Sequence, residues 1–207
     1  VATGVAEVVV CYRALNGRSG QRYSAGVSGT LITGSAIHYG YYMPFGLLTP
    51  ASWVALFTRR YMHLTGCTQD ALFEIAQATR DYAVRNPAAF FYQRPMTRAD
   101  YDAGKKICNP LTLFDCCQES DGGCAIVVTT PERARHLKQP GVSIRGVAQC
   151  IAKDQEEMTS FYRPDIARIP EMDLAADEAY AQCGLSAQDI DAAVIYDAFT
   201  PIVLWQL

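Results

Sequence analysis

The sequence predicts an α/β fold whose core is interrupted by a long, mainly helical insertion. Short apolar runs rich in β-branched residues at 7–12, 124–130 and 192–195 are typical of buried strands. Stretches of helical periodicity alternate with the later runs, and this alternation favours an α/β core. The block 16–110 begins with a Gly-rich polar stretch and continues with aromatic and helical patterns. We therefore expect it to be an excursion from that core.

The insertion carries start and stop signals for two helices. Thr49 followed by Pro50 is typical of an N-cap and a first helical position, and Gly66 is placed to end that helix. A second helix is predicted from Thr68 up to Pro87, because proline cannot continue a helix.

The remaining segments predict short elements on both sides of the insertion boundary. The expected elements are a helical piece within 97–107, an extended segment at 111–117, a turn at 119–123, a helix at 131–137, a strand at 142–152 and a helix at 172–184. Helices and strands thus alternate through the second half of the chain.

Composition excludes several classes of protein. The 207 residues are 50% hydrophobic, and 18 Lys and Arg nearly balance 21 Asp and Glu, so no basic excess indicates a nucleic-acid partner. The apolar runs are too short to cross a bilayer, and no signal peptide is visible. We therefore expect a soluble, cytoplasmic protein with no membrane span.

The eight cysteines show no CxxC pair and no spacing of Cys and His that matches a zinc site. Most of them fall inside apolar runs. The sequence therefore predicts buried free thiols rather than a disulfide framework, and no metal site. The motifs of P-loops, dinucleotide-binding turns, zinc proteases and serine hydrolases are absent from the sequence.

Tyr196 and Asp197 are the first candidates for chemistry. They follow the predicted strand at 192–195 and precede a helix that begins near Thr200. Ligands of open α/β sheets bind beyond the carboxyl ends of the strands, where a phenol could give or take a proton. Equally consistent with the position is a core tyrosine whose hydroxyl is hydrogen-bonded.

Two other stretches suggest a site. In 114–123, the adjacent Cys116 and Cys117 stand among acidic residues, which would suit a nucleophile or a metal, but no base or histidine lies nearby and a turn is favoured. The stretch 38–50 concentrates aromatic residues in a predicted loop, which would line an apolar ligand pocket, form a subunit interface or make a small separate core. Its candidate substrate-binding residues are His38, Tyr41, Tyr42, Met43 and Phe45.

The stretches MPFGLLTPASW, LFDCCQESDG and YDAF together resemble the thiolase superfamily. The resemblance covers nearly the whole chain. It is strongest to the thiolase-like lipid-transfer proteins and steroid side-chain aldolases, which are related to the sterol carrier protein x thiolases. It implies part of a layered αβαβα fold with an inserted loop domain. The chain would then be the middle half of a subunit.

The resemblance also divides the chain into three parts. It assigns 1–16 and 111–140 to the N-terminal thiolase half, 17–110 to the loop domain, and 141–207 to the start of the C-terminal half. The position of the thiolase nucleophile is expected upstream of Val1.

The YDAF stretch, Tyr196 to Phe199, matches an Asn-Glu-Ala-Phe motif in thiolases and a His-Asp-Cys-Phe motif in the sterol carrier branch. A tyrosine there implies the aldolases of bacterial steroid side-chain degradation. These cleave a β-hydroxy acyl-CoA by a retro-aldol reaction to a ketosteroid and a short acyl-CoA. Tyr196 would be the catalytic residue, and Asp197 would support it. Coenzyme A would be part of the substrate, with no bound cofactor.

The resemblance implies a homodimer and a partner subunit with an OB fold and a zinc ribbon, besides the acyl-CoA substrate. Two alternatives remain open. One is a degradative 3-ketoacyl-CoA thiolase or acyltransferase of the sterol carrier branch. The other is a subunit that binds lipid or acyl-CoA without catalysis.

Overall fold

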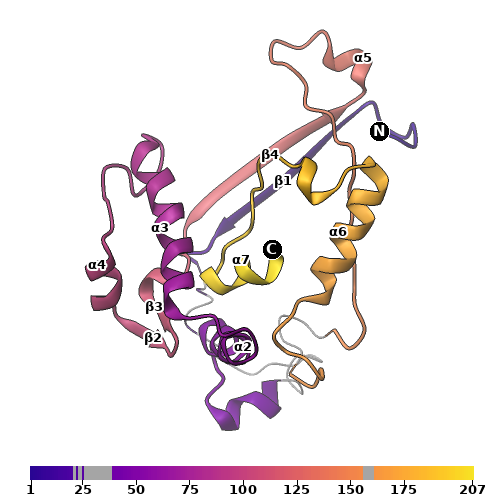
Figure 1. Cartoon of the computed structure of the whole chain (residues 1–207). Helices are drawn as coiled ribbons and strands as arrows, with labels where there is room; N and C mark the ends of the chain where they lie inside the picture. Colours follow the sequence, from indigo (N-terminus) through magenta and orange to yellow (C-terminus); the bar gives the residue numbers. More distant parts are fainter. Residues whose placement is uncertain (21, 23–24, 26–38, 156–160) are drawn as a thin grey trace.

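The computed structural model describes residues 1–20, 22, 25, 39–155 and 161–207 (Figure 1). The structure is a mixture of helices and small antiparallel sheets. In chain order the elements are β1 (Val8–Asn16), η2 (Met43–Phe45), α2 (Pro50–Thr65), α3 (Gln69–Arg85), α4 (Arg98–Ala103), β2 (Lys106–Cys108), β3 (Leu111–Thr112), η3 (Leu113–Asp115), β4 (Asp121–Thr129), α5 (Pro131–Ala134), α6 (Pro170–Cys183), η4 (Ala187–Asp189) and α7 (Thr200–Gln206).

A long two-stranded ribbon joins the two flanks of the insertion. Strand β1 pairs antiparallel with β4, in a register that runs from Val8 opposite Thr129 to Asn16 opposite Asp121. Figure 1 shows the ribbon running from the α3 side of the molecule to α5. The insertion therefore leaves and re-enters the fold at one end of a continuous pair of strands.

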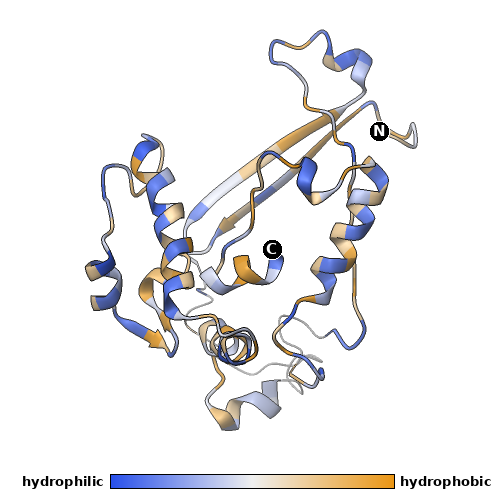
Figure 2. Ribbon diagram, viewed as in Figure 1, coloured by the Kyte–Doolittle hydropathy of each residue, from blue (hydrophilic) through white to orange (hydrophobic). Residues whose placement is uncertain are grey.

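The ribbon corrects two sequence predictions. Its strands are largely exposed rather than buried, although Figure 2 shows apolar residues along much of both. Two strands alone cover neither of their faces, which explains the exposure. The turn predicted at 119–123 is also wrong in part, because Gly122 and Gly123 already pair with Leu15 and Ala14 in the ladder.

The helices of the insertion begin and end where the sequence predicted. Thr49 caps α2 in a reciprocal capping box with Ser52, and Gly66 ends the helix in the left-handed conformation at φ +74°. Thr68 caps α3, which ends before Pro87. Local capping chemistry thus fixes both helices. Helices α4 and α5 likewise fall within the ranges predicted for them, whereas α6 begins at Pro170, two residues before its predicted start.

Two adjoining clusters form the core. Val54, Ala55, Leu72 and Leu111 pack together, with Phe199, Leu204 and Trp205 from the end of the chain against them. The second cluster comprises Ala76, Met96 and Tyr101, with Phe73 and Phe114 against it. The core therefore lies where α2, α3, α4, β3 and α7 meet.

Helix α6 lies on the side of the molecule opposite α3 and α4 (Figure 1). Arg163 forms an ion pair with Glu171 in its first turn, and Gly184 ends it at φ +67°. The strands predicted at 142–152 and 192–195 are not formed, and both stretches are largely exposed, with Val194 fully so. An apolar extended segment becomes a strand only where a neighbour completes its hydrogen-bond ladder.

The eight cysteines are all free of disulfides, as predicted, but none is buried. Cys11 lies in β1 and Cys124 in β4. Both thiols are exposed because the two-stranded ribbon is exposed. Among the described residues, no helix is long and apolar enough to span a membrane.

The buried position of Leu72 yields a stability prediction. We expect Leu72→Ala, which truncates a side chain with 0% exposure, to lower the free energy of unfolding by about 2–5 kcal/mol in denaturant titrations. The same change at Leu64, which is 51% exposed on α2, should cost no more than about 0.5 kcal/mol. Equal losses at the two positions would contradict this placement of the core.

Candidate functional site

The buried carboxylate of Asp115 lies at the centre of the site. Asp115 is 1% exposed and accepts four hydrogen bonds. Its Oδ1 accepts from the Tyr101 hydroxyl at 2.7 Å and the Thr200 hydroxyl at 2.8 Å. Its Oδ2 accepts from the backbone N–H of Thr112 at 2.7 Å and from the Thr112 hydroxyl at 2.9 Å. Two donors to each oxygen match the acceptor capacity of an ionised carboxylate.

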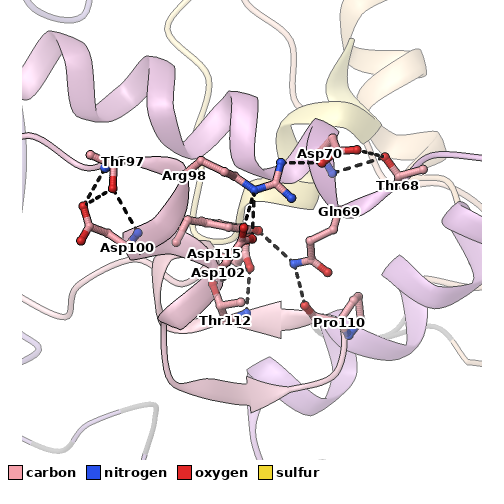
Figure 3. Close-up of polar contacts among 11 residues, drawn as sticks. Thr68, Gln69, Asp70, Thr97, Arg98, Asp100, Asp102, Pro110, Thr112 and Asp115 are labelled. Carbon is pink, nitrogen blue, oxygen red and sulfur yellow. Dashed lines mark hydrogen bonds and ion pairs between the residues drawn. The ribbon is translucent and has the colours of Figure 1, made fainter.

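A local motif places this carboxylate. Thr112 caps η3, and its side chain exchanges hydrogen bonds with Asp115 in a capping box (Figure 3). The extended segment predicted at 111–117 is therefore wrong at 113–115, where the box closes a 3-10 turn, while Cys116 beyond it is extended again. From the sequence, Asp115 is only one of the acidic residues around Cys116 and Cys117. The spacing Thr-x-x-Asp was the signal that could have identified it.

The network extends from Asp115 to α3. The Tyr101 hydroxyl, which donates to Asp115, accepts from the side-chain amide of Gln69 at 3.0 Å. The same amide donates to the carbonyl of Pro110 at 3.0 Å (Figure 3). Burial and the hydrogen bond to Asp115 raise the pKa of Tyr101. This phenol is therefore a fixed donor rather than a base.

The outer rim of the network is a surface ion-pair group. Arg98 bridges Asp70 of α3 and Asp102 of α4 (Figure 3). Hydrogen bonding and the nearby charge of Arg98 lower the pKa of Asp70. All three side chains are exposed, so solvent screens these pairs and they add little to stability.

The other side of Asp115 is linked to the predicted catalytic motif. Thr200, which donates to Asp115, is the first residue of α7. The backbone N–H of Cys117 donates to the carbonyl of Ala198 at 2.9 Å, and Cys116 forms a bridge with Phe199. The stretch from Tyr196 to Thr200 is therefore held along 115–117 by main-chain and side-chain bonds.

A cavity of about 240 Å³ opens between α3, the 113–118 segment and the start of α7. Its wall is mixed in character, with apolar side chains, one cation and two carboxylates. The lining residues are Ala76, Thr79, Arg80, Ala83, Phe91, Met96, Leu113, Phe114, Asp115, Cys116, Cys117, Gln118, Asp197 and Thr200.

Arg80 is the cation of this wall. Its guanidinium lies 3.8 Å from the centre of the Phe91 ring and donates to the carbonyl of Arg94 at 3.1 Å. Both contacts hold the side chain in place. The cavity therefore combines a fixed positive group with the carboxylates of Asp115 and Asp197.

The structure separates the two residues predicted as catalytic. Asp197 is half-buried and lines the cavity, whereas Tyr196 is 76% exposed and lies just outside that lining. The backbone carbonyl of Tyr196 accepts from the side chain of Gln206 in α7 at 3.1 Å. Tyr196 follows an extended segment rather than the strand that was predicted before it.

The predicted substrate-binding residues that the structure describes do not line this cavity. Tyr42 is buried, with its ring edge-on to Phe161 at 4.9 Å between centroids. Tyr41, Met43 and Phe45 are exposed, in and beside η2. None of these four is among the described residues that line the cavity. His38 lies outside the described residues.

The adjacent cysteines are poor nucleophiles. Burial, and then the charge of Asp115, raise the pKa of the Cys116 thiol to about 12. Partial desolvation by the surrounding protein, and then the charge of Asp197, also raise the pKa of Cys117. Both thiols are therefore protonated at neutral pH, the state opposite to that of an activated nucleophile. Across the described ranges, no group of three or more His, Cys, Asp or Glu is placed to hold a metal ion.

Comparison with known proteins places this geometry in a family. The thiolase C-terminal domain-like family matches residues 152–207. Over the whole chain, the sequence is 53% identical to a steroid side-chain-cleaving aldolase of Thermomonospora curvata. It is 48% identical to a 17-hydroxy-3-oxo-4-pregnene-20-carboxyl-CoA lyase of Mycobacterium tuberculosis, again over the whole chain. The chain belongs to the thiolase-like family.

Solved structures agree. The structure superposes on an Ltp2-ChsH2(DUF35) aldolase with a TM-score of 0.92 and 51% identity, covering all of this chain and 52% of that one. A thiolase-like protein of the SCP2 type from Mycobacterium smegmatis gives a TM-score of 0.68 at 20% identity, over 99% of this chain and 42% of that one, and shows the shared fold. The predicted α/β, thiolase-like fold and the predicted family are therefore confirmed. The chain spans about half the length of the curated relatives, 54% of each of the two enzymes above.

The cysteine environment yields a chemical prediction. A thiol pKa of about 12 for Cys116 lowers its thiolate fraction at pH 8 about a thousandfold relative to a free cysteine. A more basic thiolate is a better nucleophile, which offsets part of the loss of thiolate. Alkylation of Cys116 should therefore be about 30- to 100-fold slower in the native protein than in the denatured one. Iodoacetamide labelling followed by peptide mass spectrometry would compare the native protein with the denatured one. Equal rates in the two states would contradict the environment described for Cys116.

Proposed function

We propose that this chain is part of a thiolase-like acyl-CoA aldolase. The reaction is retro-aldol cleavage of a β-hydroxy steroid side-chain CoA thioester to a ketosteroid and a short acyl-CoA. The observation that carries the proposal is the identity of 53% and 48%, over the whole chain, to two enzymes named as an aldolase and a lyase of such substrates. The Tyr196-Asp197 motif beside the cavity gives the proposal a chemical site.

The bond changes define what the site must supply. The β-hydroxyl loses its proton, its oxygen becomes the ketone carbonyl, and the bond between Cα and Cβ breaks. The electron pair passes to Cα as a thioester enolate, which is then protonated. The reaction therefore needs one group to accept a proton and one to donate a proton, but no acyl acceptor on the enzyme.

We assign one of these transfers to the Tyr196 phenol, which is accessible to a substrate. Asp197 lies at the cavity wall next to it and supports the motif. A phenol can relay a proton in either direction if the transfer is concerted, since its ordinary pKa is about 10. The raised pKa values of Cys116 and Cys117 favour a reaction without a covalent acyl-enzyme over one that uses either thiol.

The wider organisation forms part of the same proposal. Residues 1–16 and 111–140 would belong to the N-terminal thiolase half, 17–110 to a loop domain, and 141–207 to the start of the C-terminal half. The loop domain would shape the channel for the sterol and the acyl-CoA. Its substrate-binding candidates are His38, Tyr41, Tyr42, Met43 and Phe45, of which Tyr41, Met43 and Phe45 are exposed and able to meet a ligand.

A solved relative is named as an Ltp2-ChsH2(DUF35) aldolase, which supports a partner subunit for this protein too. We propose that the partner carries an OB fold and a zinc ribbon and that the core is a homodimer. Coenzyme A enters only as part of the substrate. The eight cysteines without disulfides fit a reducing, cytoplasmic location.

The central test is Tyr196→Phe in a protein that spans the full length of the relatives, assayed with its partner. Ketosteroid release from a β-hydroxy steroid acyl-CoA should fall by about 100-fold or more in kcat, since general acid-base groups contribute about 10²–10⁴. The matched control is Tyr82→Phe, which removes a hydroxyl from an exposed tyrosine of α3. The control should leave kcat unchanged.

If cleavage survives Tyr196→Phe, Tyr196 takes no part in the proton transfers, but the aldolase reaction itself still stands. A wild-type protein that binds the thioester but releases no ketosteroid would instead support a non-catalytic binding subunit.

A further inference from the structure

The hydrogen bonds of Asp115 converge from three elements onto a fourth. Tyr101 comes from α4, Thr112 from β3, Thr200 from α7, and Asp115 itself ends η3. Through Tyr101, the network also reaches Gln69 at the start of α3. A buried carboxylate with all its acceptor sites filled is stiff, because moving any donor away leaves a charged oxygen unsatisfied.

The hydrogen bond from Thr200 to Asp115 differs from the other three because it attaches the Tyr196–Phe199 stretch to the carboxylate. Thr200 follows the stretch from Tyr196 to Phe199 and is 6% exposed. It is 85 residues from Asp115 in sequence, so this bond joins the motif to the insertion and its flank across the fold. The three other bonds to Asp115 come from residues 101 and 112, within the same local part of the chain.

Thr200 Oγ1 is the one side-chain donor that anchors the motif to Asp115. Main-chain contacts fix the direction of the Tyr196–Phe199 stretch. They join Cys117 to Ala198 and Cys116 to Phe199. The hydroxyl of Thr200 fixes where α7 begins, and the side chain of Gln206 in α7 in turn bonds the carbonyl of Tyr196. The position of Tyr196 is thus linked to Asp115 from both ends of α7.

We propose that Asp115 is a positioning residue for the reaction. Its buried carboxylate accepts the Thr200 hydroxyl and so sets the start of α7 and the placement of Tyr196 and Asp197 beside the cavity. Asp115 transfers no proton to the substrate, because its oxygens are occupied by protein donors. This inference rests on the proposed function for its kinetic consequence, but the anchoring itself can be measured without any reaction.

Two matched variants each remove one of the two donors to Asp115 Oδ1. Thr200→Val deletes the hydroxyl that α7 donates to Asp115, and Tyr101→Phe deletes the hydroxyl that α4 donates to it. Both leave one charged hydrogen bond unmade, so both should lower the melting temperature. Thr200→Ser keeps the hydroxyl and serves as the rescue variant.

In the full-length protein with its partner, we expect Thr200→Val to lower kcat by about 10- to 100-fold with KM changed less than about 3-fold, since small misplacements of a catalytic group cost this much. Thr200→Ser should restore most of kcat, and Tyr101→Phe should keep kcat within about 3-fold of wild type. Equal kcat losses for Thr200→Val and Tyr101→Phe, no loss for Thr200→Val, or no rescue by serine would overturn the inference.

Hydrogen–deuterium exchange gives a readout that does not depend on the reaction. Peptides covering 196–207 should exchange faster in Thr200→Val than in wild type, and should be unchanged in Tyr101→Phe. If the wild-type protein cleaves no β-hydroxy thioester, the proposed function fails and exchange alone decides the inference. If Thr200→Val loses activity through KM and exchange at 196–207 is unchanged, Thr200 contacts the substrate directly and Asp115 has no positioning role.

Discussion

The buried carboxylate of Asp115 is the interaction on which the rest of this structure depends. Removing a charge from water is expensive unless hydrogen bonds replace its hydration, and here four donors do so. Three of the donors are local, but Thr200 is 85 residues from Asp115, so the charge is fully hydrogen-bonded only when α7 packs against the insertion. The two apolar clusters lie directly around this network, since Tyr101 belongs to one and Leu111 precedes Thr112 in the other.

The same charge shapes the chemistry around it. Burial, together with Asp115, raises the pKa values of Tyr101 and Cys116, so the groups nearest to the carboxylate are held in their protonated forms. The adjacent cysteines resemble a nucleophilic site in sequence but are electrostatically unsuited to be one. Thiolase chemistry requires a thiolate that attacks an acyl group, whereas retro-aldol cleavage requires only proton transfers around a breaking carbon–carbon bond. The environment of 115–117 therefore disfavours Cys116 and Cys117 as nucleophiles, whereas proton transfers beside the cavity do not depend on them.

Local signals in the sequence were sufficient for the helices. The caps at Thr49 and Thr68 and the stops at Gly66 and Gly184 act within a single turn, so the sequence contains all the information needed. The strands predicted at 142–152 and 192–195 are not formed. A strand depends on a neighbouring strand, which the periodicity of its own sequence does not reveal. The predicted family was confirmed, since its motifs are distinctive in sequence.

The site was predicted less completely. The Tyr196-Asp197 motif was singled out from its position, and the structure brings Asp197, but not Tyr196, to the cavity wall. Arg80 and Asp115 were missed as parts of one site, because α3, the 113–118 segment and α7 meet only through tertiary packing. The sequence left the aromatic stretch at 38–50 open between a ligand pocket, a subunit interface and a small separate core, and its described candidate residues do not line this cavity.

The most direct test of the account is whether ketosteroid release requires free coenzyme A. A protein spanning the full length of the relatives, with its partner, would be incubated with a β-hydroxy steroid acyl-CoA from which all free CoA has been removed. Retro-aldol cleavage has no acyl acceptor, so the account predicts an equal rate of ketosteroid formation with and without added CoA. Formation that depends on added CoA, accompanied by cleavage of a 3-ketoacyl-CoA, would show thiolase chemistry and contradict it.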